Sequence, residues 1–351
     1  MSSTRETIDL RSDTLTLPSE AMKQAMVTSP LGDDMIDVDP TVEQLQADLA
    51  RVLRKEAALF MPSGTMTNQI ALRVHCQPGD ELICDDQAHI YHYEQGAFAQ
   101  LSGLSVRPLA GNCGCLEPEA IVDAIRPPGL HTVTTRLLCL ENTHNRGGGT
   151  VIPLDLCAEL CETARSHGLA THLDGARLFN AVVASGVAAH EFAALFDTVS
   201  VCFSKGLGAP VGSALVGSRE AIEKARRYRK LFGGAMRQAG VLAGAALYAL
   251  HHNVERLAED HRTAAVLAEC VRRSPHLTLE PERVETNIVI FRVAEAWGGD
   301  AARFVARLEE QGVRSFPFSR RHVRLVTHMH ISTDDALKAG EIVERIARER
   351  D

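Results

Sequence analysis

The sequence predicts an α/β protein with a large, mostly parallel sheet of seven strands followed by a smaller α+β unit. Between about residues 57 and 217, short apolar runs alternate with helical stretches, which is typical of a parallel sheet covered on both faces. After residue 273 the pattern changes to separate strands and helices. With 351 residues, 45% of them hydrophobic, the chain can bury one large and one small core. We therefore expect domains at residues 1–250 and 251–351.

Seven apolar runs in the first part are the predicted strands of the sheet. They are Ala57–Phe60, Glu81–Cys84, Val106–Leu109, Leu137–Glu141, Ala170–Asp174, Thr198–Phe203 and Ser213–Val216. Functional groups of such sheets gather at the carboxyl ends of the strands. The residues found just there are Ser63, His89, Asn142, Asp174 and Lys205.

A long helical region is predicted from Gly240 to about Arg273, because apolar residues recur at helical spacing with no glycine or proline after Gly244. We expect it to link the two domains. The last part then contains predicted strands and helices. The strands are Thr286–Val293 and Val323–Val326, and the helices are Ala301–Gln311 and Thr333–Ala347, the last with Ser332 and Asp335 as a capping pair.

Composition excludes several classes of protein. A formal charge of −8 without blocks of like charge argues against a nucleic-acid surface, and no run approaches the roughly 18 apolar residues of a membrane span. The start Met1–Arg5 lacks the apolar core of a signal peptide, so we expect a cytoplasmic protein. The nine cysteines stand mostly in apolar runs, so we expect neither disulfides nor a metal site, and we interpret Cys113–Cys115 as a loop.

Lys205 is the most informative residue of the chain. It follows the apolar run Val199–Ser204 and opens the glycine-rich stretch Gly206–Gly212, and Asp174 ends another apolar strand upstream. A pyridoxal phosphate enzyme needs such a pair, a Schiff-base lysine and a carboxylate for the ring nitrogen. The pair points to amino-acid chemistry with pyridoxal phosphate as the cofactor.

The Lys205 loop has two other interpretations. In a dinucleotide fingerprint the third glycine would fall on Val211, and Pro210 stands where the first helical turn should donate N–H groups, so the spacing excludes that motif. A lysine beside glycines is more often a solvated turn. That second interpretation stays open on Lys205 alone.

A phosphate cradle is predicted at Phe60–Asn68, where a strand end, a tight turn and a helix start follow one another. Ser63, Gly64 and Thr65 bring free N–H groups and hydroxyls to one point there. A plain capped helix would look the same. Together with Asp174 and Lys205, however, the segment supplies the third contact that the cofactor requires.

His89 follows the second strand, where an aromatic ring can lie over a flat cofactor, although a lone histidine is more often structural. Asp9–Thr14 would ordinarily be a polar turn, and Arg324 a surface residue of a strand.

Nine ordered segments together resemble the low-specificity L-threonine aldolases. They are Asp9–Thr14, Gly32–Asp34 with Asp39–Val42, Phe60–Asn68, Ala88–Tyr91, Leu140–Asn145, Leu173–Asn180, Ser204–Gly208, Gly233–Gly240 and Arg324–His328. The resemblance covers nearly the whole chain.

This resemblance implies a pyridoxal phosphate-dependent transferase fold of type I. It also implies cleavage of L-threonine, L-allo-threonine and related β-hydroxy-α-amino acids to glycine and an aldehyde, in a homotetramer with active sites at subunit interfaces. By matching position it implies Lys205 as the Schiff-base lysine, Asp174 as the partner of the pyridine nitrogen and His89 stacked on the ring. The other implied roles are phosphate binding by Gly64 and Thr65 next to Ser63, substrate carboxylate binding by Ser12, Arg177 and Arg324, contact with the β-hydroxyl by His89 and His131, and a phosphate contact from a neighbouring subunit by Arg237.

The chain departs from the family pattern at two places. Met35-Ile36-Asp37 stands where Val-Tyr-Gly is usual, and Met329-His330 stands where leucine and aspartate are common. Both departures bear on substrate preference. Two rival functions stay open, another pyridoxal phosphate enzyme such as a lyase, an aminotransferase or a serine hydroxymethyltransferase, and a nucleotide-binding module without activity.

Overall fold

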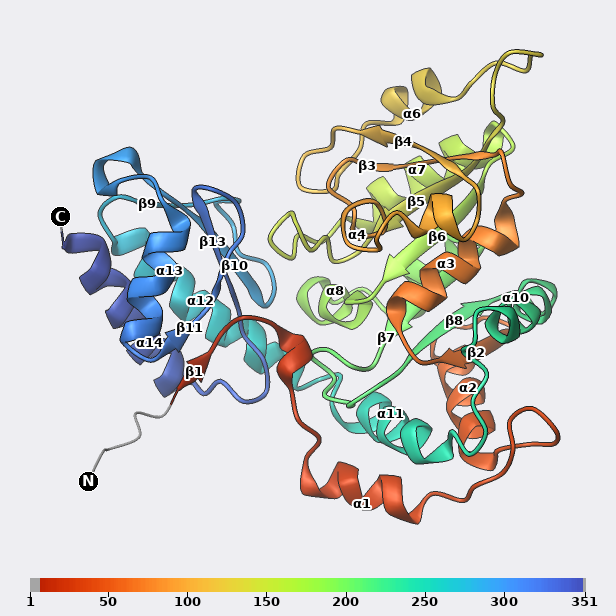
Figure 1. The fold of residues 1–351 in the computed structure, drawn as a ribbon, viewed down its shortest axis with the longest axis horizontal. Helices are drawn as coiled ribbons and strands as arrows, with labels where there is room; N and C mark the ends of the chain where they lie inside the picture. Colours follow the sequence, from red (N-terminus) through yellow and green to blue (C-terminus); the bar gives the residue numbers. More distant parts are fainter. Residues whose placement is uncertain (1–6, 350–351) are drawn as a thin grey trace.

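A seven-stranded sheet forms the centre of the larger of two lobes (Figure 1). The computed structural model describes residues 7–349. The strand order is β2-β8-β7-β6-β5-β3-β4, and only β8 runs against its neighbours. The strands are β2 Ala57–Met61, β3 Glu81–Asp85, β4 Ser105–Leu109, β5 Thr135–Glu141, β6 Ala170–Gly175, β7 Thr198–Cys202 and β8 Ser213–Gly217. All seven predicted strands are therefore confirmed, with ends that differ by two residues or fewer.

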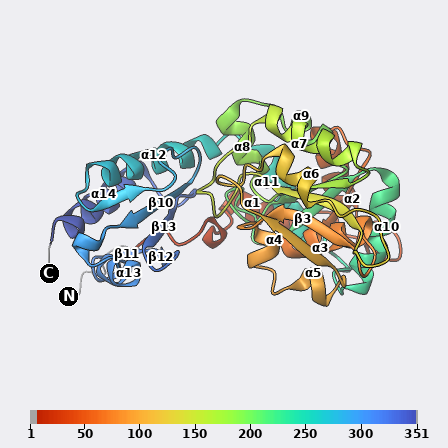
Figure 2. The same cartoon turned by 90° about the horizontal axis from the view of Figure 1, so that it is seen from above.

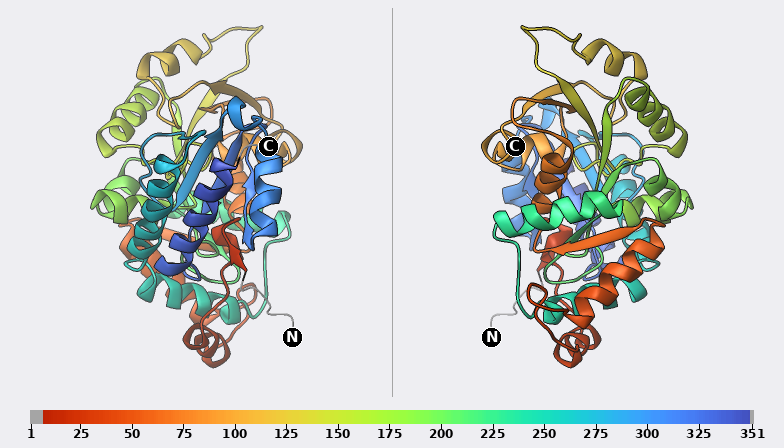
Figure 3. Two further views of the ribbon diagram at one scale, coloured as in Figure 1. Left: turned by 90° about the vertical axis from the view of Figure 1, so that its left-hand side faces the viewer. Right: turned by 90° about the vertical axis from the view of Figure 1, so that its right-hand side faces the viewer.

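Helices cover both faces of this sheet (Figure 3). Phe60 of β2 packs into the largest core, while Leu59 beside it packs into a separate core on the opposite face. Because successive side chains of a strand point to opposite faces, burial of both positions explains why the predicted strands are continuously apolar. The helices of this lobe are α1 Glu20–Thr28, α2 Pro40–Val52, α3 Gly64–His75, α4 His89–His92, α5 Ala97–Gln100, α6 Pro118–Ala124, α7 Leu154–Ser166, α8 Leu178–Ser185, α9 Ala189–Ala194, α10 Arg219–Leu231 and α11 Gly240–His252.

The smaller lobe is an antiparallel sheet in the order β12-β13-β10-β9, packed against three helices (Figure 2). Its elements are α12 Leu257–Arg273, β9 Leu277–Leu279, β10 Ile288–Val293, α13 Ala301–Glu310, β12 Phe316–Pro317, β13 His322–Val326 and α14 Thr333–Arg348. Both predicted strands and both predicted helices are present, and Ser332 and Asp335 form the predicted capping box. The α+β character of the last part is confirmed.

The amino-terminal segment packs with the smaller lobe. Strand β1, Ile8–Asp9, pairs in parallel with β11, Val313–Arg314, and Ile8 and Leu10 are buried in the core of the smaller lobe. The segment then crosses to the larger lobe, where α1 contacts α11. The predicted domain limits at residue 250 stay a prediction.

The helical region predicted from Gly240 to Arg273 is present, but the structure divides it into two helices, α11 and α12. The break begins at Asn253, whose side-chain amide donates to the carbonyl of Leu207 at 2.7 Å. Asparagine competes for backbone partners in this way, and no glycine or proline is needed to stop the helix. As a result, α11 packs with the larger core and most of α12 with the smaller one.

Two expectations concern the amino terminus and membrane-spanning segments. The start Met1–Arg5 lies outside the described residues. Within residues 7–349, no helix is long and apolar enough to cross a membrane.

Candidate functional site

An inner cavity of about 220 Å³ opens at the carboxyl edge of the large sheet. Lys205, Asp174 and His89 line it, together with the start of α3 at Ser63, Gly64 and Thr65. These residues lie at or just after the ends of four different strands, β7, β6, β3 and β2. The parallel arrangement of those strands explains why segments distant in sequence meet here.

The backbone carbonyl of Lys205 is fixed by two hydrogen bonds. It accepts from the hydroxyl of Thr16 at 3.1 Å and from the amide of Gly208 at 2.9 Å. Gly208 has a φ of +82°, a conformation that favours glycine. Together with the bond from Asn253 to Leu207, these contacts fix the turn that presents the lysine side chain to the cavity.

Asp174 is a buried carboxylate at the bottom of the inner cavity. Its Oδ2 accepts from Asn68 Nδ2 at 2.8 Å and its Oδ1 from the amide of Ala176 at 3.1 Å. Burial by itself raises the pKa of Asp174, but the charges of His89 and Lys205 and the Asn68 hydrogen bond outweigh it and lower the pKa. The carboxyl group is therefore ionised at neutral pH.

Asn68 is oriented by a buried histidine on the far side. His172 Nε2 lies 3.2 Å from Asn68 Oδ1, and its Nδ1 lies 2.9 Å from the Thr198 hydroxyl. Burial lowers the pKa of His172 to about 3, so the ring is neutral, and Nε2 must be its donor because an amide oxygen only accepts. The amide nitrogen of Asn68 consequently faces the carboxylates.

His89 is held by a second buried carboxylate, Glu94. His89 Nδ1 lies 3.0 Å from Glu94 Oε1, and Asn68 Nδ2 donates to the same oxygen at 2.9 Å. Burial lowers the pKa of His89, but the hydrogen bond that His89 donates to Glu94 and the charge of Asp174 outweigh it, so the net direction is upward. With Nδ1 used, the remaining nitrogen, Nε2, is left for the cavity.

His89, Glu94 and Asp174 also place one ligand atom each within 4.8 Å of one another, as a metal site would. Asn68 donates to both carboxylates, and Glu94 Oε2 accepts from Gln69 at 2.5 Å. The atoms that would bind a metal are therefore committed to hydrogen bonds.

An outer cavity of about 560 Å³ adjoins the inner one and shares Thr14, His89 and Lys205 with it. Ser12, Arg177 and Arg324 line its wall. The structure thus brings the three residues predicted for a substrate carboxylate to one place beside Lys205.

Arg177 and Arg324 differ in how far they are already engaged. Arg177 forms two hydrogen bonds of 2.7 Å with Asp13, and both side chains are buried. Arg324 donates from Nη1 to Asn145 at 3.0 Å and from Nη2 to the carbonyl of Arg11 at 3.4 Å, while its buried Nε has no protein partner within the described residues. Arg324 is thus the guanidinium with more capacity for an anion.

The start of α3 has free donors for a phosphate. The hydroxyl of Ser63 caps the helix by accepting from Met66 N at 3.3 Å. The first amides of a helix have no partner within it. Those of Gly64 and Thr65 belong to this turn and line the inner cavity.

Two predicted residues lie elsewhere in the single chain. His131 is exposed in the loop before β5, at the amino edge of the sheet, and lines neither cavity. Arg237 also lines neither and contacts Asp33 with a separation of 3.4 Å. One chain therefore does not bring either residue to Lys205.

The two departures from the family pattern have structural partners. Met35 Sδ lies 3.9 Å from Arg229 Nη2, in a loop tied down by the ion pair of Arg229 with Asp34 at 2.6 Å. His330 Nε2 accepts from the amide of Leu17 at 2.9 Å. Neither residue lines the inner or the outer cavity.

The sequence did not indicate a role for three residues of the site, Asp13, Asn68 and Glu94. Asp13 and Asn68 stand inside segments that carried the family resemblance, which was a usable signal. Glu94 lies just beyond such a segment, five residues after its histidine partner. A pairing between a histidine in α4 and the turn after it could not be recognised from spacing alone.

Comparisons with known proteins agree with this geometry. Residues 9–296 match the family described as beta-eliminating lyase. A probable low-specificity L-threonine aldolase 2 from Arabidopsis thaliana is 44% identical over 347 residues, covering 98% of both chains. The low specificity L-threonine aldolase of Escherichia coli (strain K12) is 44% identical over 328 residues, covering 93% of this chain and 95% of that protein.

Among solved structures, Leishmania major threonine aldolase has a TM-score of 0.83 at 20% identity, covering 97% of this chain and 99% of that one. A serine palmitoyltransferase from Sphingomonas wittichii has a TM-score of 0.76 at 18% identity, covering 99% of this chain and 88% of that one. At such identities the likeness shows the fold alone, since enzymes with different names share it.

Proposed function

The chain belongs to the beta-eliminating lyase family and, within it, to the low-specificity L-threonine aldolases, and from this we propose that it cleaves L-threonine and L-allo-threonine to glycine and acetaldehyde. The observation that carries the proposal is the meeting of Lys205, Asp174 and His89 in one cavity, with Arg324 beside them. An amine, an ionised carboxylate, a histidine and an anion-binding guanidinium are the groups that this reaction requires.

We propose pyridoxal phosphate as the cofactor, because the donor set of the inner cavity fits it. Lys205 would attach to its aldehyde carbon, Asp174 would face its ring nitrogen, and Gly64 and Thr65 would bind its phosphate. When bound, the cofactor would take up the electron pair that the broken Cα–Cβ bond leaves on Cα. Asp174 stays ionised, so it would hold a proton at the ring nitrogen.

Arg324 and Ser12 would bind the substrate carboxylate, with Arg177 beside them. Support comes from the free Nε of Arg324 and from the outer cavity that these residues share. A guanidinium fixes the plane of a carboxylate through parallel hydrogen bonds. The carboxylate would then set which bond at Cα stands perpendicular to the cofactor ring.

His89 would remove the proton of the β-hydroxyl through Nε2. The contact between Glu94 and Nδ1 supports this role, since it leaves Nε2 as the nitrogen available to the cavity. His131 would contact the same hydroxyl only from a neighbouring copy of the chain. One such hydrogen bond contributes about 0.5–1.5 kcal/mol, which is roughly a two- to twelvefold preference between the two L-epimers.

The stereochemistry of cleavage tests this assignment. Inversion at Cα would break the simultaneous placement of amine, carboxylate and scissile bond, so D-threonine should not be cleaved. Measuring kcat/KM for the four stereoisomers checks both statements. A ratio above about a thousand between the L-epimers, roughly 4 kcal/mol, exceeds what one hydroxyl contact supplies.

The experiment that tests the function is acetaldehyde release from L-threonine by the holoenzyme without folate. Rapid release supports the proposal, whereas activity only with folate, or only in transamination, would identify another enzyme of the same fold. A yellow protein whose colour is lost on borohydride treatment would separate every such enzyme from a nucleotide-binding module.

We further propose a homotetramer that acts in the cytoplasm, with active sites completed at subunit interfaces. The exposed positions of His131 and Arg237 support an interface, since neither residue reaches a cavity of its own chain. Nine unpaired cysteines fit a reducing compartment. Mixing inactive Lys205→Ala and His131→Ala subunits should restore part of the activity, and no recovery in a mixture proven to exchange subunits would contradict a shared site.

A further inference from the structure

Arg146 stands in the wall between two cavities. It lines the outer cavity beside Lys205, and with Phe318 it also lines a neighbouring cavity of about 590 Å³. The neighbouring cavity extends between the lobes past Gln87 and Ile290. A substrate side chain that leaves the reacting carbons in this direction would meet the guanidinium first.

The outer cavity carries an excess of positive charge. Its lining residues include Lys205, Arg146, Arg177 and Arg324, and no aspartate or glutamate of the described residues lines it. Arg177 is neutralised by its ion pair with Asp13, and the amine of Lys205 would react with the aldehyde of the cofactor. One substrate carboxylate at Arg324 would therefore leave Arg146 uncompensated.

No carboxylate of the described residues pairs with Arg146. Its Nε donates to Gln87 Oε1 at 2.8 Å and its Nη1 to the Tyr93 hydroxyl at 2.7 Å, and both acceptors are neutral. Within residues 7–349 it forms no ion pair. Two glutamates line the neighbouring cavity: Glu280 is engaged by Arg292 and His322 at 2.6 Å each, and Glu282 forms no ion pair with Arg146.

The guanidinium is nevertheless held firmly. It lies 4.6 Å from the centre of the Phe318 ring and 5.8 Å from that of Tyr93. Stacking and two hydrogen bonds fix the group while leaving Nη2 unused. A group that is ordered in advance loses little entropy when it binds a carboxylate. Arg146 does not line the inner cavity, so it would not be one of the residues that hold the cofactor phosphate there.

We propose that this site takes β-hydroxy-α-amino acids whose side chain ends in a carboxylate, and that Arg146 binds this second carboxylate. The inference rests on the proposed aldol cleavage. For 3-hydroxyaspartate, the Cα–Cβ bond breaks, the hydroxyl loses its proton as Cβ becomes the aldehyde carbon of glyoxylate, and Cα gains a proton to give glycine. Atoms and charge balance without an oxidant or a reductant.

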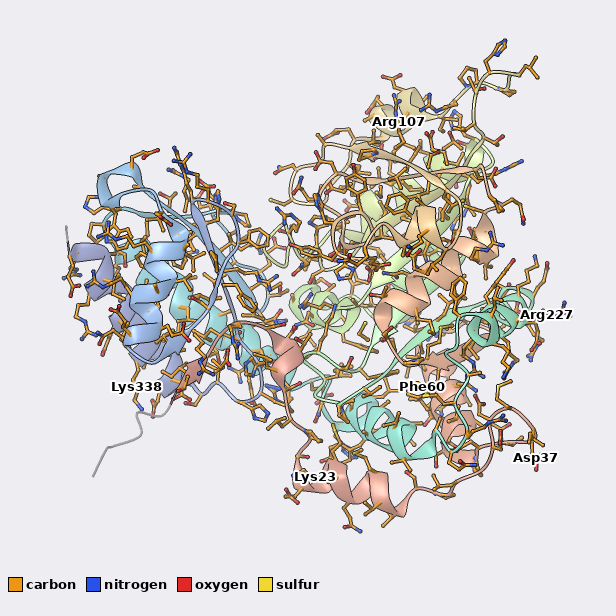
Figure 4. The ribbon with its side chains drawn as sticks, in the orientation of Figure 1. Lys23, Asp37, Phe60, Arg107, Arg227 and Lys338 are labelled. Atoms are coloured by element: carbon orange, nitrogen blue, oxygen red, sulfur yellow. The ribbon has the colours of Figure 1, made fainter. Side chains whose placement is uncertain are left out.

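Cleavage of L-3-hydroxyaspartate and of L-threonine by the holoenzyme tests the inference. We expect the ratio of kcat/KM for hydroxyaspartate to that for threonine to exceed one in the wild type, and to fall at least tenfold in Arg146→Gln. Arg146→Lys should lose less because it keeps the charge. Arg107→Gln is the matched control, since Arg107 is exposed on the edge strand β4 away from the smaller lobe (Figure 4), and it should leave the ratio unchanged.

Inhibition of threonine cleavage provides a second measurement that needs no turnover of the acidic substrate. L-Aspartate should inhibit at least tenfold more strongly than L-2-aminobutyrate, which has the size of threonine without a second carboxylate, and Arg146→Gln should abolish the difference. An active threonine enzyme with equal inhibition by the two, or with a parallel loss for both substrates in Arg146→Gln, overturns the inference alone. A holoenzyme that cleaves neither substrate overturns the proposed function instead.

Discussion

Replacing Glu94 by glutamine should change the proton affinity of His89 without disturbing the fold. The Glu94 side chain is 0% exposed, and its oxygens accept from His89, Asn68 and Gln69. In Glu94→Gln the amide oxygen can keep the bonds to His89 and Asn68. The new amide nitrogen can donate to Gln69 after that residue turns its own amide, since Gln69 Oε1 has no partner within the described residues. Only the charge is then lost.

The size and sign of the effect follow from that charge. A hydrogen bond to a charged group contributes about 1.5–3 kcal/mol and a neutral one about 0.5–1.5, so the substitution removes about 1–1.5 kcal/mol. One pKa unit corresponds to about 1.4 kcal/mol. The pKa of His89, which Glu94 and Asp174 raise against the effect of burial, should therefore fall by roughly one unit.

The assay is the pH profile of kcat/KM for threonine cleavage. If neutral His89 is the base, the rate falls as the pH drops through its pKa, so the acid limb of Glu94→Gln should lie roughly one unit lower than that of the wild type. Gln69→Met is the control, because it removes a partner of Glu94 but keeps the charge, and it should leave the limb in place. An unmoved limb in Glu94→Gln, in a variant that melts like the wild type, would refute the role of Glu94.

Three further predictions concern single residues. Lys205→Ala should lose the borohydride-sensitive absorbance of the bound cofactor and several orders of magnitude in turnover, because no other lysine within residues 7–349 lines the inner cavity. Arg324→Lys should lower kcat/KM at least about tenfold, or roughly 1.4 kcal/mol, because an ammonium lacks paired donors; a change below twofold contradicts carboxylate binding. Burial raises the pKa of Asp260 to about 7, so the folded protein holds a proton there that the unfolded chain releases above about pH 4, and stability from this group falls as the pH rises from about 4 to 7. The melting temperature of Asp260→Asn minus that of the wild type should therefore become more positive as the pH is raised from 5 to 8.

Much of the fold was predictable because burial on both faces leaves a direct trace in the sequence. The strands of the large sheet are continuous apolar runs, and parallel connections require their functional residues to gather at one edge. This is why Lys205, Asp174 and His89 were recognised before any contact was known. The start of α3 was predictable for a related reason, since Ser63 is a standard capping residue.

The buried polar partners were harder to predict from the sequence, because their hydrogen bonds form only in the folded state. Asn68 lies on a helix and bonds a carboxylate 106 residues away, and no local pattern indicates such a pairing. Asn253 divides the predicted helical region through a contact with Leu207, which lies 46 residues earlier in the sequence. His131 is the opposite case, since matching position implied a role that a single chain does not bring to the cavity.

The candidate site contains residues from both lobes, and the residues proposed for the cofactor come from a different lobe than Arg324 and Ser12, which are proposed for the substrate carboxylate. Lys205 follows β7 and Asp174 lies near the end of β6 in the large sheet, whereas Arg324 lies on β13 and Ser12 follows β1, both of which pack with the smaller core. A substrate bound at both places would span the lobes. Asp13 already makes such a bridge, because it accepts from Arg177 of the larger lobe at 2.7 Å and from Asn287 of the smaller lobe at 3.2 Å. Since these bonds are buried, they set the separation of the two halves before any substrate binds, so that binding energy is not spent on bringing the halves together.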